Sequence, residues 1–218
     1  MSLASARIGF GVLLLMTLTT GCKSASNAFW EKMGYEKRDL LVSDVKKARD
    51  EQNKAKEEIK TTMQRFKEVT NFQGGELESK YNKLKAAYDD AESRAGKVSG
   101  RIENVEKTAG DLFEEWEEEL AQYTDPQLRS LSRERLTETK SKYQELITVM
   151  RQAESKMKPV LAAFNNHVLF LKHNLNAAAI SSLQGTAATI DQEVSRLIAD
   201  MEASIKEAND FISSIEKS

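Results

Sequence analysis

Cysteine and proline are almost absent from this chain, and each shortage excludes a class of structure. The single cysteine, Cys22, has no second thiol with which to form an internal disulfide, so no disulfide framework holds the fold. Prolines occur only at Pro126 and Pro159, which leaves long stretches free to form helices. After Cys22, no apolar run is long enough to cross a membrane. The sequence therefore indicates helices that are held together by packing alone.

An excess of positive charge is also missing. The chain has 32 basic and 34 acidic residues, which gives a net charge of −2, whereas nucleic-acid binding needs a strongly basic face. We therefore expect no nucleic-acid partner. Charged residues make up 30% of the chain and are mixed in sign, a composition typical of long helices exposed to water.

The motifs of common catalytic and cofactor sites are absent as well. The only Gly-Lys pair, Gly96-Lys97, lacks both the first glycine of a phosphate loop and the hydroxyl residue that should follow the lysine. Neither His167 nor His173 has a glutamate three residues before it, so the Glu-x-x-His motif of di-iron bundles is missing. Two histidines six residues apart on a helix face different ways and do not make a zinc site. We expect no catalytic residue, no cofactor and no metal, and we interpret the protein as a non-enzyme.

The N-terminus carries an export pattern. Arg7 precedes an apolar run from 8 to 18 that is too short to span a bilayer, which predicts a signal peptide over residues 1–21. The stretch Leu18-Thr19-Thr20-Gly21-Cys22 resembles the lipobox of bacterial lipoproteins, although Thr19 stands where that pattern prefers a leucine-like residue. The resemblance implies that Cys22 is lipidated after cleavage ahead of it. The alternative is a plain secretory signal followed by an incidental thiol.

Residues 22–36 are interpreted as a lipidated tether. Phe29 and Trp30 are candidates for contact with the membrane interface, where aromatic rings are favoured. The alternative is that both pack against the end of the helical domain. By resemblance to lipoprotein sorting in enteric bacteria, Lys23 after the cysteine favours the outer over the inner membrane.

A seven-residue alternation of apolar positions is the strongest signal in the chain, and it predicts helix-packing seams. The first seam consists of Leu41, Val45, Ala48, Gln52, Ala55, Ile59, Thr62, Phe66 and Val69. The second consists of Leu77, Tyr81, Leu84, Tyr88, Ala91, Ala95, Val98, Ile102, Val105, Ala109, Leu112 and Trp116. The third consists of Leu136, Thr139, Tyr143, Leu146, Met150, Ala153, Met157, Val160, Phe164, His167 and Leu171. The fourth consists of Ala187, Ile190, Val194, Leu197, Met201, Ser204, Ala208, Phe211 and Ile215.

The breaks between the seams follow helix-ending chemistry. Gly74-Gly75 ends the first helix, while Asp125 caps the third and Pro126 occupies its first turn. The last turn is expected between 174 and 188, where Asn174, Asn176 and Gly185 are the candidates, and Thr189 with Gln192 would make a capping box. Short connections make consecutive helices antiparallel. We therefore predict an all-α fold, an elongated antiparallel bundle or coiled coil of three to four long helices over residues 37–218.

The run FEEWEEEL, residues 113–120, is the sharpest local feature outside the seams. One interpretation places Trp116 in the seam and the glutamates on a solvated face. The other is an interaction patch, made of Glu114, Glu115, Trp116 and Glu118, for a basic partner or a divalent cation.

Several longer stretches resemble one family. They are MGYEKRDLLVSDVKKARDEQNKAKEE at 33–58, FQGGELESKYNKL at 72–84 and LKHNLNAAAISSLQ at 171–184, together with the signal and lipobox. They are similar to proteobacterial lipoproteins catalogued as a domain of unknown function, DUF2959. Some members carry the label "DNA repair ATPase", which does not fit an exported chain without a phosphate loop. The resemblance transfers no activity and no functional residue.

These observations favour an envelope lipoprotein that faces the periplasm and acts by contact. The first hypothesis is a scaffold or spacer that is anchored to the membrane through a lipid on Cys22 and binds an envelope protein. The alternative is a stress-responsive holdase that cradles clients along a pliable groove, and a third is membrane remodelling by a curved bundle. The polar seam positions leave homo-oligomers open.

Overall fold

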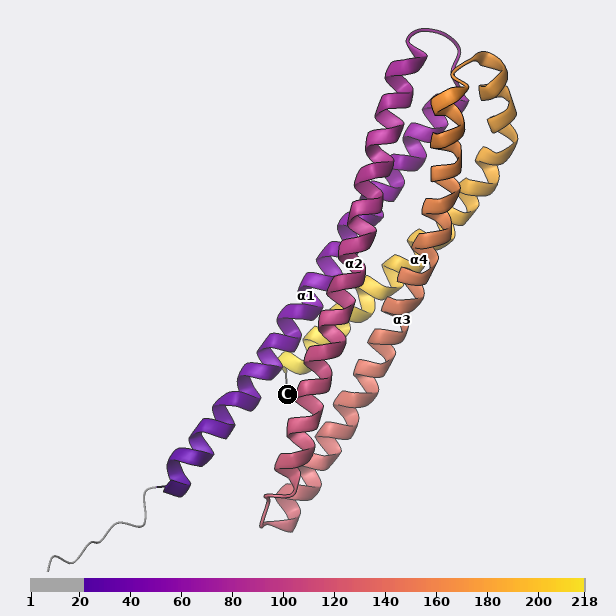
Figure 1. The fold of residues 1–218 in the computed structure, drawn as a ribbon. Coiled ribbons are helices and arrows are strands. Elements are labelled where there is room, and N and C mark those ends of the chain that lie inside the picture. The colour runs from indigo at the N-terminus through magenta and orange to yellow at the C-terminus, as the bar shows by residue number, and fades with distance from the viewer. Residues whose placement is uncertain (1–21, 218) are drawn as a thin grey trace, which may run out of the picture. The chain divides into compact units, whose positions relative to one another are not determined.

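The fold is an all-α bundle whose described part consists of four long helices (Figure 1). The computed structural model describes the backbone of residues 22–217 and the side chains of residues 36–217. The helices are α1 (Cys22–Thr70), α2 (Leu77–Leu120), α3 (Pro126–His173) and α4 (Ala177–Glu216). The chain divides into the units Met1–Met33 and Gly34–Ser218, and the architecture below is that of the second unit. The predicted signal peptide, residues 1–21, lies outside the described residues.

The first two connections form where the sequence predicts them. Gly74 and Gly75 have φ angles of 138° and 103°, a backbone region that side chains disfavour, so glycine suits this turn. Asp125 caps α3 by accepting hydrogen bonds from the backbone N–H groups of Gln127 and Leu128 at 2.8 and 3.2 Å. Local residue chemistry thus sets both boundaries.

The third connection corrects one prediction. The capping box at Thr189 and Gln192 is wrong, because both residues lie well inside α4. The cap is Asn176, whose side-chain oxygen accepts a hydrogen bond from the N–H of Ala179 at 3.0 Å. The turn therefore takes only residues 174–176, inside the predicted range, and it is shorter than the connection of residues 121–125 before α3.

Hydrogen bonds between helices show an antiparallel arrangement. Arg94 of α2 binds Glu51 of α1 at 2.9 Å, and Thr108 of α2 donates to Asp44 of α1 at 2.9 Å. The partner on α1 moves toward the N-terminus as the position on α2 moves toward the C-terminus, so the two helices run in opposite directions. The guanidinium of Arg151 on α3 donates hydrogen bonds to both carboxylate oxygens of Glu106 on α2.

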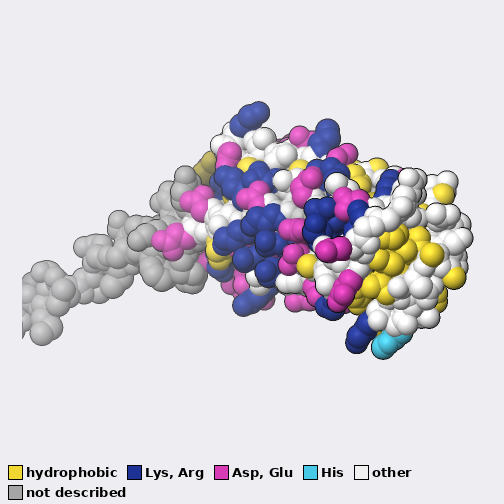
Figure 2. Space-filling view, turned by 90° about the horizontal axis from the view of Figure 1, so that it is seen from above, with side chains coloured by type: hydrophobic (Ala, Val, Ile, Leu, Met, Phe, Trp, Pro, Cys, Tyr) yellow, Lys and Arg dark blue, Asp and Glu magenta, His cyan; other side chains and the backbone are white. Residues whose placement is uncertain are grey.

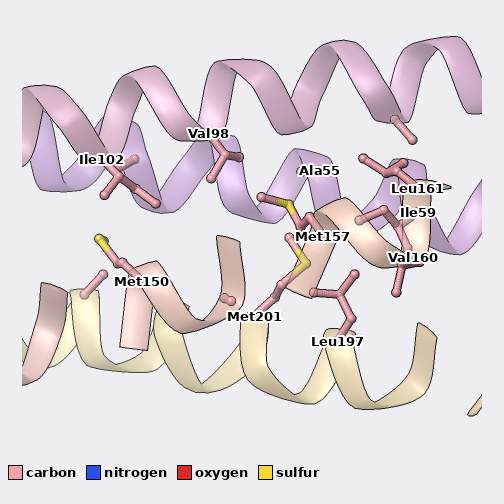
Figure 3. Close-up of a cluster of buried hydrophobic side chains, with 14 of the residues drawn as sticks. Ala55, Ile59, Val98, Ile102, Met150, Met157, Val160, Leu161, Leu197 and Met201 are labelled. Atoms are coloured by element: carbon pink, nitrogen blue, oxygen red, sulfur yellow. The ribbon is translucent and has the colours of Figure 1, made fainter. Parts of the chain in front are cut away.

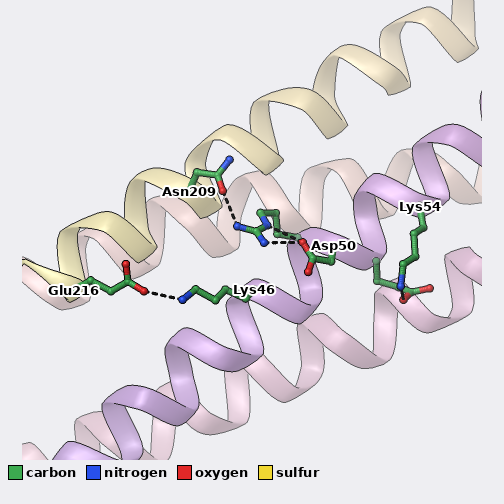
Figure 4. Close-up of polar contacts among 7 residues, drawn as sticks. Lys46, Asp50, Lys54, Asn209 and Glu216 are labelled. Carbon is green, nitrogen blue, oxygen red and sulfur yellow. Dashed lines mark hydrogen bonds and ion pairs between the residues drawn. The ribbon is translucent and has the colours of Figure 1, made fainter.

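Helix α4 closes the bundle between α3 and α1. Asp200 of α4 accepts hydrogen bonds from Gln152 and Lys156 of α3 at 3.2 and 2.6 Å. On its other side, Glu216 binds Lys46 at 2.7 Å, and Asn209 accepts a hydrogen bond from Arg49 at 2.9 Å (Figure 4). Each such exposed pair stabilises the fold by only about 0–1 kcal/mol, so these contacts align α4 more than they hold it.

The core follows the predicted seams along the whole bundle. Every predicted seam residue is buried or half-buried in the structure, and none is exposed. In the middle of the bundle, side chains from all the helices point toward one another (Figure 3). That layer includes Ala55, Ile59, Val98, Ile102, Met150, Met157, Leu197 and Met201. Burial of these apolar surfaces, at about 25 cal/mol per Å², is the main force that holds the fold.

Aromatic side chains join α1 to α3 across the bundle. The Phe66 and Phe164 rings meet edge to face, with 6.0 Å between their centroids. The His167 ring lies 5.1 Å from Phe66, which places this histidine against the core. Burial lowers the pKa of His167 below its ordinary value.

Three of the polar seam residues make specific contacts between helices. Ser204 of α4 donates to the side-chain oxygen of Gln52 on α1 at 2.9 Å, and both side chains are fully buried. Thr62 of α1 donates to the backbone carbonyl of Ala87 on α2 at 3.0 Å. Buried polar pairs of this kind favour one register of neighbouring helices over another. Among the described helices, none combines enough length with enough apolarity to span a membrane.

Candidate functional site

The predicted interaction patch lies in the last turns of α2, and its members do not share one surface. Glu114 and Glu118 are exposed, whereas Trp116 is half-buried and Glu115 is only 6% exposed. Glu115 therefore departs from both interpretations of FEEWEEEL, since it belongs neither to a solvated face nor to an accessible acidic patch. Flanking these residues, Phe113 joins the core.

Trp116 connects α2 to α3. Its indole Nε1–H donates to the Ser132 hydroxyl at 2.9 Å, and its ring packs against the hydrophobic core. A half-buried indole with its N–H satisfied is well ordered, because both its apolar face and its polar edge are engaged. The exposed part of the ring lines a cleft, which is described below.

Glu115 forms an ion pair with Lys37 of α1. The Lys37 ammonium lies 2.9 Å from a carboxylate oxygen of Glu115, and it donates to the backbone carbonyl of Asp111 at 3.3 Å. The carboxylate is at ion-pair distance but outside hydrogen-bond geometry, so neither of its oxygens accepts a hydrogen bond among the described residues. The attraction to Lys37 is therefore what compensates the burial of this charge.

A second carboxyl shares this environment. Burial raises the pKa of Glu119, the nearby negative charge of Glu115 raises it further, and Lys37 opposes the rise. The two carboxyls thus depend on one lysine from another helix. This arrangement couples the start of the described part of α1 to the end of α2.

A cleft of about 140 Å³ opens where α4 ends, between the start of the bundle section of α1, the end of α2 and the first turns of α3. Its lining combines an apolar floor with a charged rim. The floor residues are Leu41, Leu112, Trp116 and Ile215, and the polar residues are Arg38, Arg135, Glu138, Thr139, Lys142 and Ser214.

The rim of the cleft carries more positive than negative charge. Glu138 pairs with Lys142 at 2.8 Å and with Arg135 at 3.4 Å, and Lys142 is the main reason that the pKa of Glu138 is lowered. Arg38 donates to the backbone carbonyl of Ile215 at 3.1 Å, where the end of a helix gathers partial negative charge. Three cations and one carboxylate line the cleft, so it suits an anionic group attached to an apolar body.

The rim residues were missed at the level of sequence. Arg135, Glu138 and Lys142 are spaced three and four residues apart, which places them on one face of a helix, and that signal was available. Arg38 and Ile215, in contrast, are 177 positions apart. No local pattern indicates that they meet.

The other predicted sites lie outside the described side chains. Helix α1 begins at Cys22, but side chains are described only from residue 36. The side chains of Cys22, Phe29 and Trp30 therefore lie outside the described part. Among the residues that are described, no three His, Cys, Asp or Glu side chains converge on a position for a metal ion.

Comparison with known proteins decides the family. Residues 27–215 match the family model "Protein of unknown function (DUF2959)". The chain belongs to the DUF2959 family. The match takes in all of α2, α3 and the core of the bundle, together with both sides of the cleft. A search of the curated proteins and a search of the solved structures each found no match.

Proposed function

We propose that the chain is an envelope lipoprotein that faces the periplasm and acts as a scaffold or spacer. A lipid on Cys22 anchors it to the membrane, and the outer membrane is favoured over the inner. The observation that carries this proposal is the stretch Leu18-Thr19-Thr20-Gly21-Cys22, which resembles the lipobox of bacterial lipoproteins. The first seam of the core follows it in the chain, from Leu41 to Val69.

The bundle itself supports a mechanical role. Its seams are packed from Leu41 to Ile215, and its helices are linked at several levels by ion pairs such as Arg94–Glu51 and Arg151–Glu106. Packed helices of this length resist bending, because bending separates buried side chains from their neighbours. In this proposal the protein performs no chemistry, and its effect comes from what it holds and at what distance.

The cleft beside Trp116 is the proposed contact for an envelope protein. Its apolar floor and cationic rim would take an exposed carboxylate next to an apolar side chain on the partner. Arg135 and Lys142 reach its mouth from α3, so a charge reversal at these positions would remove the attraction without disturbing the core.

Photo-crosslinking in intact cells tests this contact. A crosslinking amino acid is placed at Thr139 in the cleft or, as a control, at the exposed position Ser195 on α4. The proposal predicts a discrete adduct from position 139 only, which is lost in the Arg135→Glu, Lys142→Glu variant. An adduct of twice the chain mass identifies a homo-oligomer. Identical adducts from both positions, or none from position 139, contradict the proposed contact.

One observation favours the holdase as a second candidate. A groove of about 360 Å³ lies between α2 and α3, with Met157, Leu161 and Ala95 in its lining. Flexible methionine side chains suit binding of varied apolar clients. Residues 23–218 would then suppress aggregation of a heat-denatured test protein, and Leu161→Glu would weaken this effect. Aggregation at the uninhibited rate excludes the holdase.

A further inference from the structure

Two large apolar side chains near the end of α3 are exposed to solvent. Leu169 is 51% exposed and Phe170 is 40% exposed, although the neighbouring Val168 and Leu171 are buried in the core. Adjacent exposed side chains of this size can mark an interaction surface. The first turn of α4 adds the exposed Ala177 and Ala178 directly after the short connection.

The charge pattern of the α3–α4 hairpin indicates what this surface contacts. Residues 155–190 contain no aspartate and no glutamate, although the chain has 34 acidic residues in 218. Residues 174–190 contain no charged residue of either sign. Lys172 and His173, both exposed, follow Phe170 at the end of α3. The hairpin therefore combines the exposed apolar Leu169 and Phe170 with the exposed cation Lys172, and residues 155–190 carry no acidic side chain.

The space-filling view agrees with this distribution. Hydrophobic side chains gather at one end of the face shown in Figure 2, whereas carboxylates and most cations lie over the rest of that face. At the same end of the bundle, the other connection is acidic: Glu76 precedes α2 and Glu78 lies in its first turn. The two connections thus differ in charge although they share one end of the bundle.

We propose that this surface binds the interface of an anionic phospholipid bilayer. The hairpin tip is defined as Leu169, Phe170, Lys172, Ala177 and Ala178. Leucine and phenylalanine insert at the boundary between headgroups and acyl chains, and a lysine beside them is attracted to anionic headgroups. An acid-free segment adds no repulsion from the negative surface. The small alanines let the helix backbone approach closely.

The tip does not depend on the proposed lipid at Cys22. It is formed by the end of α3 and the start of α4, which lie at the opposite end of the bundle from the α2–α3 connection (Figure 1). The core also lies within the unit Gly34–Ser218. Residues 22–218 with Cys22→Ser therefore keep the whole tip and the whole core, carry no acyl chain and contain no native thiol.

Site-specific fluorescence on this cysteine-free chain tests the proposal. An environment-sensitive dye is attached to a single cysteine that replaces Ala178 at the tip. In a matched protein the cysteine replaces Ser130, which is exposed at the other end of the bundle between the exposed leucines Leu128 and Leu131. Vesicles contain either phosphatidylglycerol mixed with phosphatidylcholine or phosphatidylcholine alone. The local dye distinguishes contact of the tip from attachment through residues 23–36.

We expect a blue shift from the dye at position 178 with the anionic vesicles, a much smaller one with phosphatidylcholine alone, and none from position 130. Leu169→Ser with Phe170→Ser should weaken vesicle binding of the tip about tenfold or more, while Leu128→Ser with Leu131→Ser leaves it unchanged. Lys172→Glu should weaken it at least about fivefold at low salt.

Several outcomes would overturn the proposal. They are the absence of a shift at position 178, equal shifts at positions 178 and 130, equal binding to both kinds of vesicle, and unchanged binding in the Leu169, Phe170 and Lys172 variants. A shift that needs no vesicles and grows with protein concentration would assign the tip to a second copy of the chain instead.

Discussion

Ser204 donates its hydroxyl hydrogen to the side-chain oxygen of Gln52 at 2.9 Å, across the interface of α4 and α1. The Gln52 amide nitrogen, which is equally buried, has no hydrogen-bond partner among the described residues. The pair is therefore half-satisfied. It contributes more to the choice of register than to the free energy of unfolding.

Removal of one partner of this pair should destabilise the fold more than removal of both partners. Ser204→Ala leaves the Gln52 oxygen buried without a donor, so the free energy of unfolding should fall by about 1–3 kcal/mol. The double variant Gln52→Leu, Ser204→Ala removes both polar groups and should be about as stable as the original chain or more stable. Urea unfolding measures both, with Ser195→Ala on the exposed face of α4 as the control. A double variant less stable than Ser204→Ala alone would contradict this account.

Glycines in α2 should be replaceable with a gain in stability. A methyl group added at Gly100 or Gly110 meets no atom within 4 Å, and both residues have ordinary helical φ angles. Gly100→Ala and Gly110→Ala should each raise the free energy of unfolding by about 0.5–1 kcal/mol, because alanine loses less backbone entropy in a helix. Gly75→Ala serves as the opposite control, since its φ of 103° strains any side chain, and it should destabilise. A loss of stability in Gly100→Ala and Gly110→Ala, as in Gly75→Ala, would contradict the helical backbone at positions 100 and 110.

These two predictions rest on features that the sequence indicated to different degrees. The seam alternation located nearly the whole core, because a residue that recurs every three and four positions must face the same neighbour. The turns at Gly74-Gly75 and at Pro126 follow from the backbone preferences of those residues. The start of α4 could be placed only within the range 174–188, and its capping box was wrong, because the segment after Asn176 has no charged face to contrast with its apolar one. Ile180 and Leu183 nevertheless continue the fourth seam toward the N-terminus.

The candidate site was less accessible to sequence reasoning. Glu115 resembles its exposed neighbours Glu114 and Glu118, and only the approach of Lys37 from α1 distinguishes it. The cleft exists because α4 ends at Glu216, beside residues 135–142 of α3 and short of the α2–α3 connection, and this offset depends on how the helices are staggered. Stagger is a property of the assembled bundle and of no single segment.

Stability should depend on pH through His167. Burial lowers its folded-state pKa, so between that value and the ordinary value of about 6.5 the unfolded chain binds more protons than the folded one. The free energy of unfolding should therefore fall as the pH drops from about 6.5 toward the lower folded-state pKa. His167→Gln should flatten this part of the profile, measured by urea unfolding between pH 7.5 and 5.5. His173→Gln, at an exposed position, should not; equal flattening by both would remove the assignment to His167.

The ion pair of Lys37 and Glu115 should be worth more than the exposed charges around it. Lys37→Met leaves a buried carboxylate without its cation, which should lower the free energy of unfolding by about 1–3 kcal/mol. Adding Glu115→Leu should recover much of that loss, because no uncompensated charge then remains. Glu118→Gln, on the exposed side of the same turn, should change stability by less than about 0.5 kcal/mol. If Lys37→Met is as mild as Glu118→Gln, the pair does not hold the end of the bundle.

Metabolic labelling with an alkyne-bearing fatty acid, followed by fractionation of the cells, tests the lipid anchor at Cys22 most directly. The account predicts label on the original chain in the membrane fraction, with neither label nor membrane retention of the full chain carrying Cys22→Ser. An unlabelled original chain recovered from the soluble cytoplasmic fraction would contradict the proposed anchor and, with it, the proposed envelope function.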